Sequence, residues 1–208
     1  LSIISRQKDK MISPDEMMEN IEAGNDMRLY HVAKAYKRYQ TQLKENNALD
    51  FDDIIYKTVE LLQEHEDIRT YYQRKFRYVL VDEYQDTNYV QDRIFYAISR
   101  NNRFLVGDIK QSIYRFRSAE PEIFSSYLTS FKEYDGVCVD KDGNSVHMSE
   151  NFRCDKSVID FSNTVSDYMF GTSKSIPYSE KDRLKHAKIG CDYESVVPEI
   201  YVIDKTKN

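Results

Sequence analysis

The spacing of apolar residues predicts several helices in the first third of the chain. The SPDE stretch at 13–16 has the residues of a helix start: a capping serine, a proline in the first turn and a glutamate three positions after the cap. From 27 to 43 apolar residues recur at helical spacing, with Lys and Arg opposite, which predicts a surface helix. We expect Asp50 to cap a further helix, whose buried face comprises Ile54, Ile55, Val59 and Leu62.

Two short apolar runs in the middle of the chain predict buried strands. They cover 78–81 and 104–106, and helices are predicted after them at 92–99 and 119–131. Near-continuous apolar strands that alternate with helices are typical of a parallel sheet. We therefore predict an α/β fold in which helices flank a parallel sheet.

In the last third of the chain the predicted elements are separated by longer loops. Residues 134–145 are polar and carry two glycines, which predicts a hairpin or a linker. A short strand is predicted at 146–149. A helix is predicted at 155–170, with an inward face of Val158, Phe161, Val165 and Met169. A loop-rich stretch at 171–195 and a final strand at 196–203 complete the expected order.

Composition narrows the class of protein. The 208 residues carry a net charge of -5, which disfavours a free-standing nucleic-acid binder but leaves room for a local basic groove. Cys138, Cys154 and Cys191 form no CxxC pair, so neither a zinc site nor a disulfide framework is supported. No apolar run approaches the ~20 residues of a membrane span, and the first residues have no signal-peptide layout. We expect a cytoplasmic protein with reduced thiols and no membrane partner.

The first candidate site follows the 78–81 strand. Asp82 and Glu83 stand at its carboxyl end, and Asp108 stands at the end of the second strand, where ligands of open parallel sheets bind. An aspartate in this position can hold Mg²⁺, and a following glutamate can orient or deprotonate an attacking water. The alternative is that Asp82 and Glu83 only cap the next helix.

Two further stretches follow predicted strands. Gln111 can contact a terminal phosphate, and the YRFR run at 114–117 alternates aromatic and basic residues, which suits single-stranded nucleic acid. The alternative for the run is an amphipathic segment with buried aromatics and solvated arginines. In SENFR at 149–153 an arginine could stabilise phosphoryl-transfer charge and an aromatic could stack on a base, although a surface arginine is the commoner explanation.

Four stretches occur together in order: LDFDDI (49–54), VLVDEYQDTN (79–88), VGDIKQSIYRFRSAEP (106–121) and SENFR (149–153). This set resembles the superfamily 1 DNA helicases of the UvrD, PcrA and Rep type, over roughly residues 28 to 170. GDIKQSIYRFRSAEPEIF is most similar to the AddA-type helicase–nuclease subunits. The resemblance implies a 3′-to-5′ DNA helicase or translocase of DNA repair or recombination, which uses ATP and Mg²⁺.

The resemblance also implies roles for residues at the nucleotide. Asp82 matches the magnesium-coordinating acid of the family, and Glu83 matches its catalytic base for water. Gln111 matches the glutamine that senses the γ-phosphate. Phe152 matches an aromatic that packs on adenine and is usually Tyr in PcrA-like members, and Arg153 matches an arginine directed at the γ-phosphate.

The implied nucleic-acid contacts lie in the third stretch. Tyr114 and Phe116 match aromatics of the DNA-stacking region, with Phe116 standing where PcrA-like members often carry Trp. Arg117 matches a basic residue of the same motif. Residues 50–53 match a motif near the DNA path, without a single assigned role. The expected partners are single-stranded and duplex DNA, the remainder of the helicase chain and an AddB-like subunit.

The resemblance divides the chain into three parts. Residues 1–48 would end an inserted helical 1B-like subdomain, 49–133 would form the second half of a first RecA-like domain with motifs II and III, and 134–208 would form a linker and the start of a second RecA-like domain with motif IV. None of the six glycines has another glycine five positions later, so the phosphate loop GxxxxGK[ST] is absent from these residues. We therefore expect an internal segment of a motor that does not hydrolyse ATP alone, arising by artificial truncation, gene truncation or splitting of a protein.

Two other functions remain open on the sequence. One is a non-catalytic remnant or interaction module that keeps the helicase fold, which the missing loop favours and the joint presence of Asp82, Glu83, Gln111 and Arg153 disfavours. The other is a metal-dependent nuclease built on Asp82, Glu83 and Asp86, for which no further Glu-x-Lys cluster is present.

Overall fold

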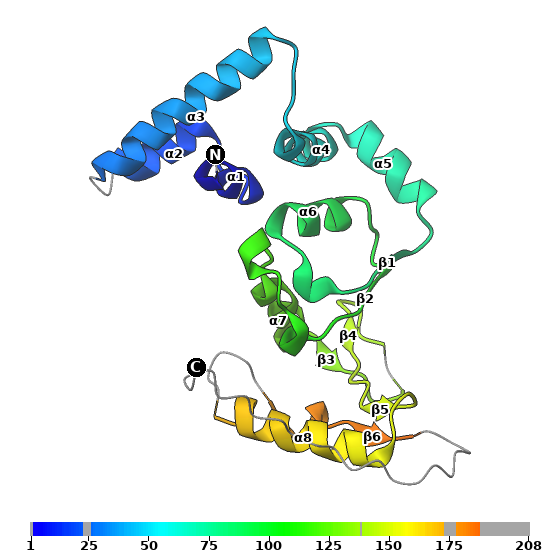
Figure 1. Ribbon diagram of the computed structural model, residues 1–208. Helices are drawn as coiled ribbons and strands as arrows, with labels where there is room; N and C mark the ends of the chain where they lie inside the picture. The colour runs from blue at the N-terminus through cyan, green and yellow to red at the C-terminus, as the bar shows by residue number, and fades with distance from the viewer. Residues whose placement is uncertain (1, 23–25, 138, 173–177, 188–208) are drawn as a thin grey trace, which may run out of the picture. The chain divides into compact units, whose positions relative to one another are not determined.

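The computed structural model describes residues 2–22, 26–137, 139–172 and 178–187 (Figure 1). The chain forms two compact units, one of residues 1–132 with 140–143, and one of residues 133–139 with 144–208. Among the described residues the protein is rich in helix, and its strands form two-stranded sheets. The predicted mixture of helices with parallel strands is confirmed at this level. The predicted strand at 196–203 lies outside the described residues.

The first unit begins with five helices: α1 (Ser2–Asp9), α2 (Pro14–Glu22), α3 (Met27–Glu45), α4 (Phe51–Glu64) and α5 (Glu66–Lys75). The helix start at 13–16 is confirmed, because the Ser13 N–H donates to Glu16 Oε2 at 2.7 Å and the Glu16 N–H donates to Ser13 Oγ at 3.2 Å. Helices α1, α2 and α3 bury one apolar cluster, which consists of Ile4, Met17, Ile21, Ala33 and Tyr36. Helices α1 and α5 were not predicted from the sequence.

Helix α4 confirms the predicted helix but corrects its buried face. Val59 and Leu62 are buried as expected, whereas Ile54 and Ile55 are exposed. Asp53 takes their place on the buried side, because α4 turns this face towards a lysine of α1. Apolar periodicity gives no weight to a charged residue, so it could not place Asp53 in the interface.

The two predicted strands exist as β1 (Val79–Val81) and β2 (Arg103–Leu105), which pair in parallel. The prediction that they are buried is wrong for their central residues. Leu80 and Phe104 are register partners, and they are 72% and 57% exposed. Val79 is buried, so packing within the described residues covers one face of this sheet.

Between and after these strands lie α6 (Tyr89–Ala97) and α7 (Pro121–Ser130). Helix α6 begins three residues earlier than the predicted 92–99. Asn88 and Gln91 form a capping box there, with the Gln91 N–H donating to Asn88 Oδ1 at 3.0 Å and the Asn88 N–H donating to Gln91 Oε1 at 3.1 Å. Helix α7 confirms the prediction at 119–131, with proline in its first turn.

The second unit contains short strands and one long helix. Strands β3 (Lys132–Glu133) and β4 (Asn144–Ser145) form one sheet, which agrees with the hairpin alternative for 134–145. The strand predicted at 146–149 is wrong, because these residues lie between β4 and β5 (Glu150–Asn151). Strand β5 pairs in parallel with β6 (Lys185–His186), a strand inside the stretch predicted as loop.

Helix α8 (Lys156–Phe170) confirms the predicted helix but not its inward face. Ile159 and Asn163 are buried, while Val158, Val165 and Met169 are exposed and Phe161 is half-buried. The Asn163 amide exchanges two 2.9 Å hydrogen bonds with the backbone of Leu184, just before β6. This polar anchor sets the rotation of α8, which apolar spacing alone does not reveal.

Candidate nucleotide and nucleic-acid site

Asp82 and Glu83 follow directly on β1 and are both exposed. Glu83 has a left-handed backbone conformation, with φ of 53°, and its N–H donates to Asp82 Oδ1 at 2.9 Å. A left-handed non-glycine residue costs free energy, and such residues are concentrated at functional sites. Helix α6 is capped by Asn88, and Glu83 makes no side-chain cap to the 3₁₀ turn Tyr84–Asp86, so the helix-cap alternative is wrong for both acids.

The ends of β1 and β2 are tied together beyond their last paired residues. The Val106 N–H donates to the Val81 carbonyl at 2.8 Å, and the Tyr84 N–H donates to the Val106 carbonyl at 2.9 Å. The acids after β1 and the Asp108 segment after β2 therefore lie at the same edge of the sheet, as expected for parallel strands.

Gln85 is the buried link between these two segments. Its Oε1 accepts a hydrogen bond from the Asp108 N–H at 3.0 Å, and its carbonyl accepts one from Ser112 Oγ at 3.4 Å. Gly107 makes this approach possible, because a Cβ there would lie 2.5 Å from Gln85 Oε1. Gln85 was not predicted as a site residue, although its place between the acids of DEYQD is a usable signal.

Asp108 organises the turn that carries Gln111. One of its carboxylate oxygens accepts from the Lys110 N–H at 3.0 Å and pairs with Lys110 Nζ at 2.8 Å. The other accepts from Gln111 Nε2 at 3.1 Å. The exposed Gln111 side chain is thus oriented by an acid that is itself fixed, through Gln85, to residues 82–88, which we call the β1 loop.

The aromatic and basic run forms a compact exposed surface. Tyr114 and Phe116 have ring centroids 6.0 Å apart, and the Arg117 guanidinium lies 5.6 Å and 5.4 Å from these two rings. Phe116 is 71% exposed, which contradicts the alternative in which the aromatics are buried. Arg115 is also exposed but is paired with Glu122 at 2.5 Å, so Arg117 is the arginine of the run that lies over the two rings.

Phe152 and Arg153 belong to the second unit and follow β5. Both are exposed. Asn151 Oδ1 accepts hydrogen bonds from the N–H groups of Arg153 and Cys154, each at 2.9 Å, so a side-chain turn fixes the backbone at this strand end.

The buried Tyr84 connects the β1 loop to helix α6 through its hydroxyl group. The Tyr84 hydroxyl donates to Asp92 Oδ1, which also accepts from the Tyr127 hydroxyl at 3.0 Å. Arg103 Nη1 donates to the Tyr127 oxygen at 3.1 Å. Burial, with the hydrogen bond to Asp92, raises the pKa of Tyr84 far above its ordinary value. This network fixes α6 and α7 against the loop, and no pattern in the sequence predicted it.

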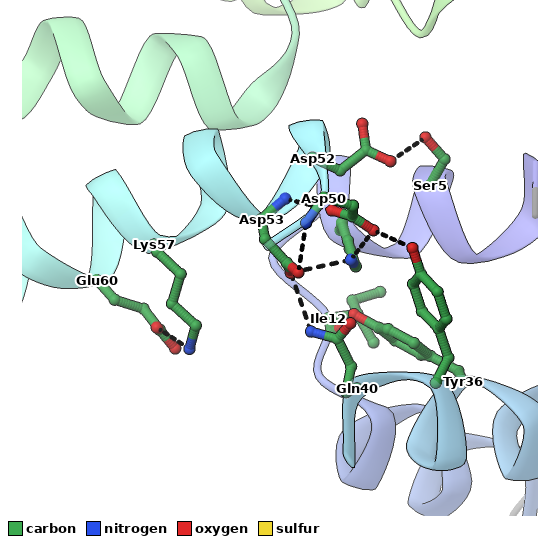
Figure 2. Close-up of polar contacts among 11 residues, drawn as sticks. Ser5, Ile12, Tyr36, Gln40, Asp50, Asp52, Asp53, Lys57 and Glu60 are labelled. Carbon is green, nitrogen blue, oxygen red and sulfur yellow. Dashed lines mark hydrogen bonds and ion pairs between the residues drawn. The ribbon is translucent and has the colours of Figure 1, made fainter. Parts of the chain in front are cut away.

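The acids of the LDFDDI stretch make ion pairs and hydrogen bonds with helix α1 (Figure 2). Lys8 of α1 pairs with Asp50 Oδ2 at 2.6 Å and Asp53 Oδ1 at 2.9 Å, and Ser5 Oγ donates to Asp52 Oδ2 at 2.7 Å. Burial would raise the pKa of Asp50, but the hydrogen bonds from Lys8, the Asp53 N–H and Tyr39 hold it below its ordinary value. These acids join α4 to the N-terminal helices.

Neither a metal-binding cluster nor a membrane-spanning helix is found in the described part of the chain. There, no group of three or more His, Cys, Asp or Glu side chains is arranged to hold a metal ion, so Asp82, Glu83 and Asp86 do not form the cluster that the nuclease alternative requires. Cys154 is a free thiol, and Cys138 and Cys191 lie outside the described residues. None of the described helices has the length and apolar character needed to cross a membrane.

Comparison with known proteins agrees with the motifs. The sequence profile of the UvrD/REP helicase N-terminal domain matches residues 1–132. The chain is 38% identical over 151 residues to an ATP-dependent helicase/nuclease subunit of Streptococcus agalactiae, and 40% identical over 152 residues to the subunit of the same name from Streptococcus sanguinis. These matches cover 72% and 73% of this chain but 12% of each relative, so the chain spans about an eighth of their length. The similarity to AddA-type subunits is confirmed, and the chain belongs to the UvrD/REP helicase family.

Proposed function

We propose that this chain is the segment of an ATP-dependent DNA helicase that holds Mg²⁺, activates water and contacts single-stranded DNA. One observation carries the proposal. The exposed acids after β1 and the Asp108–Gln111 turn after β2 lie at one sheet edge, and the buried Gln85 joins them. A shared edge lets one bound nucleotide be contacted from both strands.

The residues at this edge fit magnesium and phosphate chemistry. Asp82 offers exposed carboxylate oxygens, the ligand type that Mg²⁺ prefers, and would hold the ion together with phosphate oxygens. The Glu83 carboxylate, which caps no helix, would orient and deprotonate the attacking water. Gln111 would contact the γ-phosphate, and its hydrogen bond to Asp108 sets its direction. Bound Mg²⁺ would neutralise charge on the phosphates.

The remaining assignments complete a motor cycle. Tyr114 and Phe116 would stack on bases of single-stranded DNA, with Arg117 beside them against the phosphates. Phe152 would pack on the adenine, and Arg153 would stabilise charge at the γ-phosphate. We assign 1–48 to a 1B-like subdomain, 49–133 to a first RecA-like domain and 134–208 to the start of a second, supported by the division of the chain into two units near residue 132.

At the level of the whole protein, we propose 3′-to-5′ translocation in DNA repair or recombination, in the cytoplasm and with an AddB-like partner subunit. The supporting observation is the similarity to relatives named as ATP-dependent helicase/nuclease subunits. ATP hydrolysis by the 208 residues alone is not expected. They contain no GxxxxGK[ST] loop, and Asp82 with Mg²⁺ does not replace the lysine and backbone amides of that loop.

A chimera tests the proposal. The matched 152-residue stretch of the Streptococcus sanguinis protein is replaced by the matched stretch of this chain, and DNA-stimulated ATP turnover is measured. We expect turnover that Glu83→Gln lowers by at least about 100-fold, because the water loses its base. The matched control is Glu64→Gln, an exposed glutamate at the end of α4. A turnover that survives Glu83→Gln would contradict the assignment, as would steady turnover by the isolated 208-residue chain.

A further inference from the structure

Polar side chains of helix α1 and of the residue directly after it reach three of the motif-bearing stretches. Its Lys8 pairs with the acids of LDFDDI. Its last residue, Asp9, accepts a hydrogen bond at 3.2 Å from Asn88 Nδ2, which lies 79 positions further along the chain. Lys10, directly after the helix, lies 4.0 Å from Glu120. A single short helix therefore reaches residues that are far apart in the sequence.

Asn88 and Glu120 occupy the ends of the two functional segments. Asn88 closes the loop that begins with Asp82 and Glu83, and its Oδ1 caps α6 while its Nδ2 contacts Asp9. The Glu120 N–H, just after the aromatic and basic run, donates to the Thr87 carbonyl at 3.0 Å. The β1 loop and the run thus meet beside Asp9.

The placement of Asp9 is unfavourable for a carboxylate. It is half-buried at the C-terminal end of α1, where the helix dipole disfavours negative charge. Burial raises its pKa above the ordinary value, the charge of Asp52 adds to this, and the hydrogen bond from the Ser118 hydroxyl opposes it. Ser118 directly follows the aromatic and basic run and has a left-handed backbone conformation. The polar contacts that offset this cost come from Asn88, at the end of the β1 loop, and from Ser118, directly after the run.

We propose that Asp9 is a positioning residue that holds the loop carrying Asp82 and Glu83 against the aromatic and basic run. The inference rests on the proposed function, because it assigns nucleotide chemistry to the loop and DNA contact to the run. Asp9 touches neither ligand. It fixes the junction through which a change at one segment reaches the other.

Hydrogen exchange measured by mass spectrometry on the 208-residue chain tests the geometry. Asp9→Ala should raise exchange by about tenfold in peptides that cover 84–88 and 114–120, because a hydrogen bond to a charged group is lost. Asp9→Asn keeps an oxygen acceptor for Asn88 and should restore protection. The matched control is Asp15→Ala, at an exposed site in α2. Unchanged exchange in either segment, or an equal rise across the whole chain, would overturn the proposal.

A second readout separates the inference from the proposed function. The chain has no tryptophan, so Phe116→Trp places a single tryptophan in the run, whose fluorescence can be excited selectively over that of the 17 tyrosines. Titration with a single-stranded oligonucleotide should show weaker binding, by about tenfold, when Asp9→Ala is added, with recovery in Asp9→Asn. Equal affinity would refute coupling through Asp9. If the reporter fails to respond even with Asp9 intact, the DNA role of the run is wrong, and the exchange comparison still decides the role of Asp9.

A further variant covers the case in which Asp9→Ala does not fold. Asn88→Ser keeps an oxygen at the N-cap of α6, since serine caps helices well. It removes the amide that donates to Asp9. The same rise in exchange in 114–120 is expected, and its absence would contradict the proposal.

Discussion

The buried ion pairs of Lys8 offer the sharpest test of how the first unit is held together. The Lys8 side chain is 1% exposed, and its ammonium lies within 3 Å of carboxylate oxygens on both Asp50 and Asp53, whose side chains are 23% and 2% exposed. Lys8→Met keeps an unbranched side chain, one atom shorter than that of lysine, and removes the charge. Two carboxylates then remain at the joint between α1 and α4 without their cation.

The expected cost follows from burial. Removal of one member of a buried ion pair destabilises a protein by about 3–5 kcal/mol, because an uncompensated charge stays in the interior. Asp50 regains some water and keeps the Tyr39 hydroxyl at 2.9 Å, and Asp53 keeps Gln40 Nε2 at 2.9 Å. These donors place the expected loss near the lower end, at about 3 kcal/mol, which is a large part of the stability of an ordinary domain.

Urea unfolding of the helical signal, together with hydrogen exchange in peptides of α1 and α4, measures this loss. The matched control is Lys37→Met, whose pair with Asp15 has the same 2.6 Å separation but side chains that are 61% and 71% exposed. It should cost at most about 1 kcal/mol.

The contribution of Asp50 to the free energy of unfolding should also depend on pH. Its pKa is lowered in the folded chain, so its contribution is complete above the ordinary value of 3.8 and is lost as the pH falls below it.

A double variant separates charge from packing. Lys8→Met combined with Asp53→Leu replaces the more buried pair with apolar groups and should recover much of the loss, as buried ion pairs often exchange neutrally for apolar residues. A loss below about 1 kcal/mol for Lys8→Met, equal to that of Lys37→Met, would refute the reasoning. So would a double variant that is less stable than both single variants.

Three further predictions concern the β1 loop and its supports. Tyr84→Phe removes the donor to Asp92 and should lower the free energy of unfolding by about 1–2 kcal/mol in urea denaturation, with an unchanged midpoint counting against the network. Gly107→Ala places a Cβ 2.5 Å from Gln85 Oε1 and should cost about 1–3 kcal/mol, measured as a fall in Tm, whereas a neutral effect would show that Gln85 moves freely. Because the pKa of Asp9 is raised on folding, its charge costs stability as the pH rises through 3.8, so Asp9→Asn should gain stability relative to the native chain between pH 3 and pH 7. The opposite trend in paired unfolding curves would contradict that sign.

The sequence predicted elements well where a local signal defines them. The capping serine of α2, the aspartate before α4 and the short apolar runs of β1 and β2 are signals within a few neighbouring positions, and each of these elements is confirmed. Buried faces were predicted less well. In α4 and α8 the side chains that decide the rotation are Asp53 and Asn163, whose partners lie 45 and 21 positions away in sequence. Polar anchors of this range have no periodic signature.

The same contrast explains which residues of the candidate site could be predicted. Asp82, Glu83 and Gln111 were predicted as site residues because residues of these types at strand ends are suited to metal, water and phosphate chemistry. Asp9 has no sequence signal, and Gln85 has only its place between the acids of DEYQD, because the groups that make both residues important are met only in the fold. Both are polar, both are withdrawn from solvent, and both accept hydrogen bonds from residues in or beside a motif. The proposed function requires the loop that carries Asp82 and Glu83 to keep a fixed position relative to the aromatic and basic run. Directional hydrogen bonds suit that requirement, because they resist sliding more than apolar packing does.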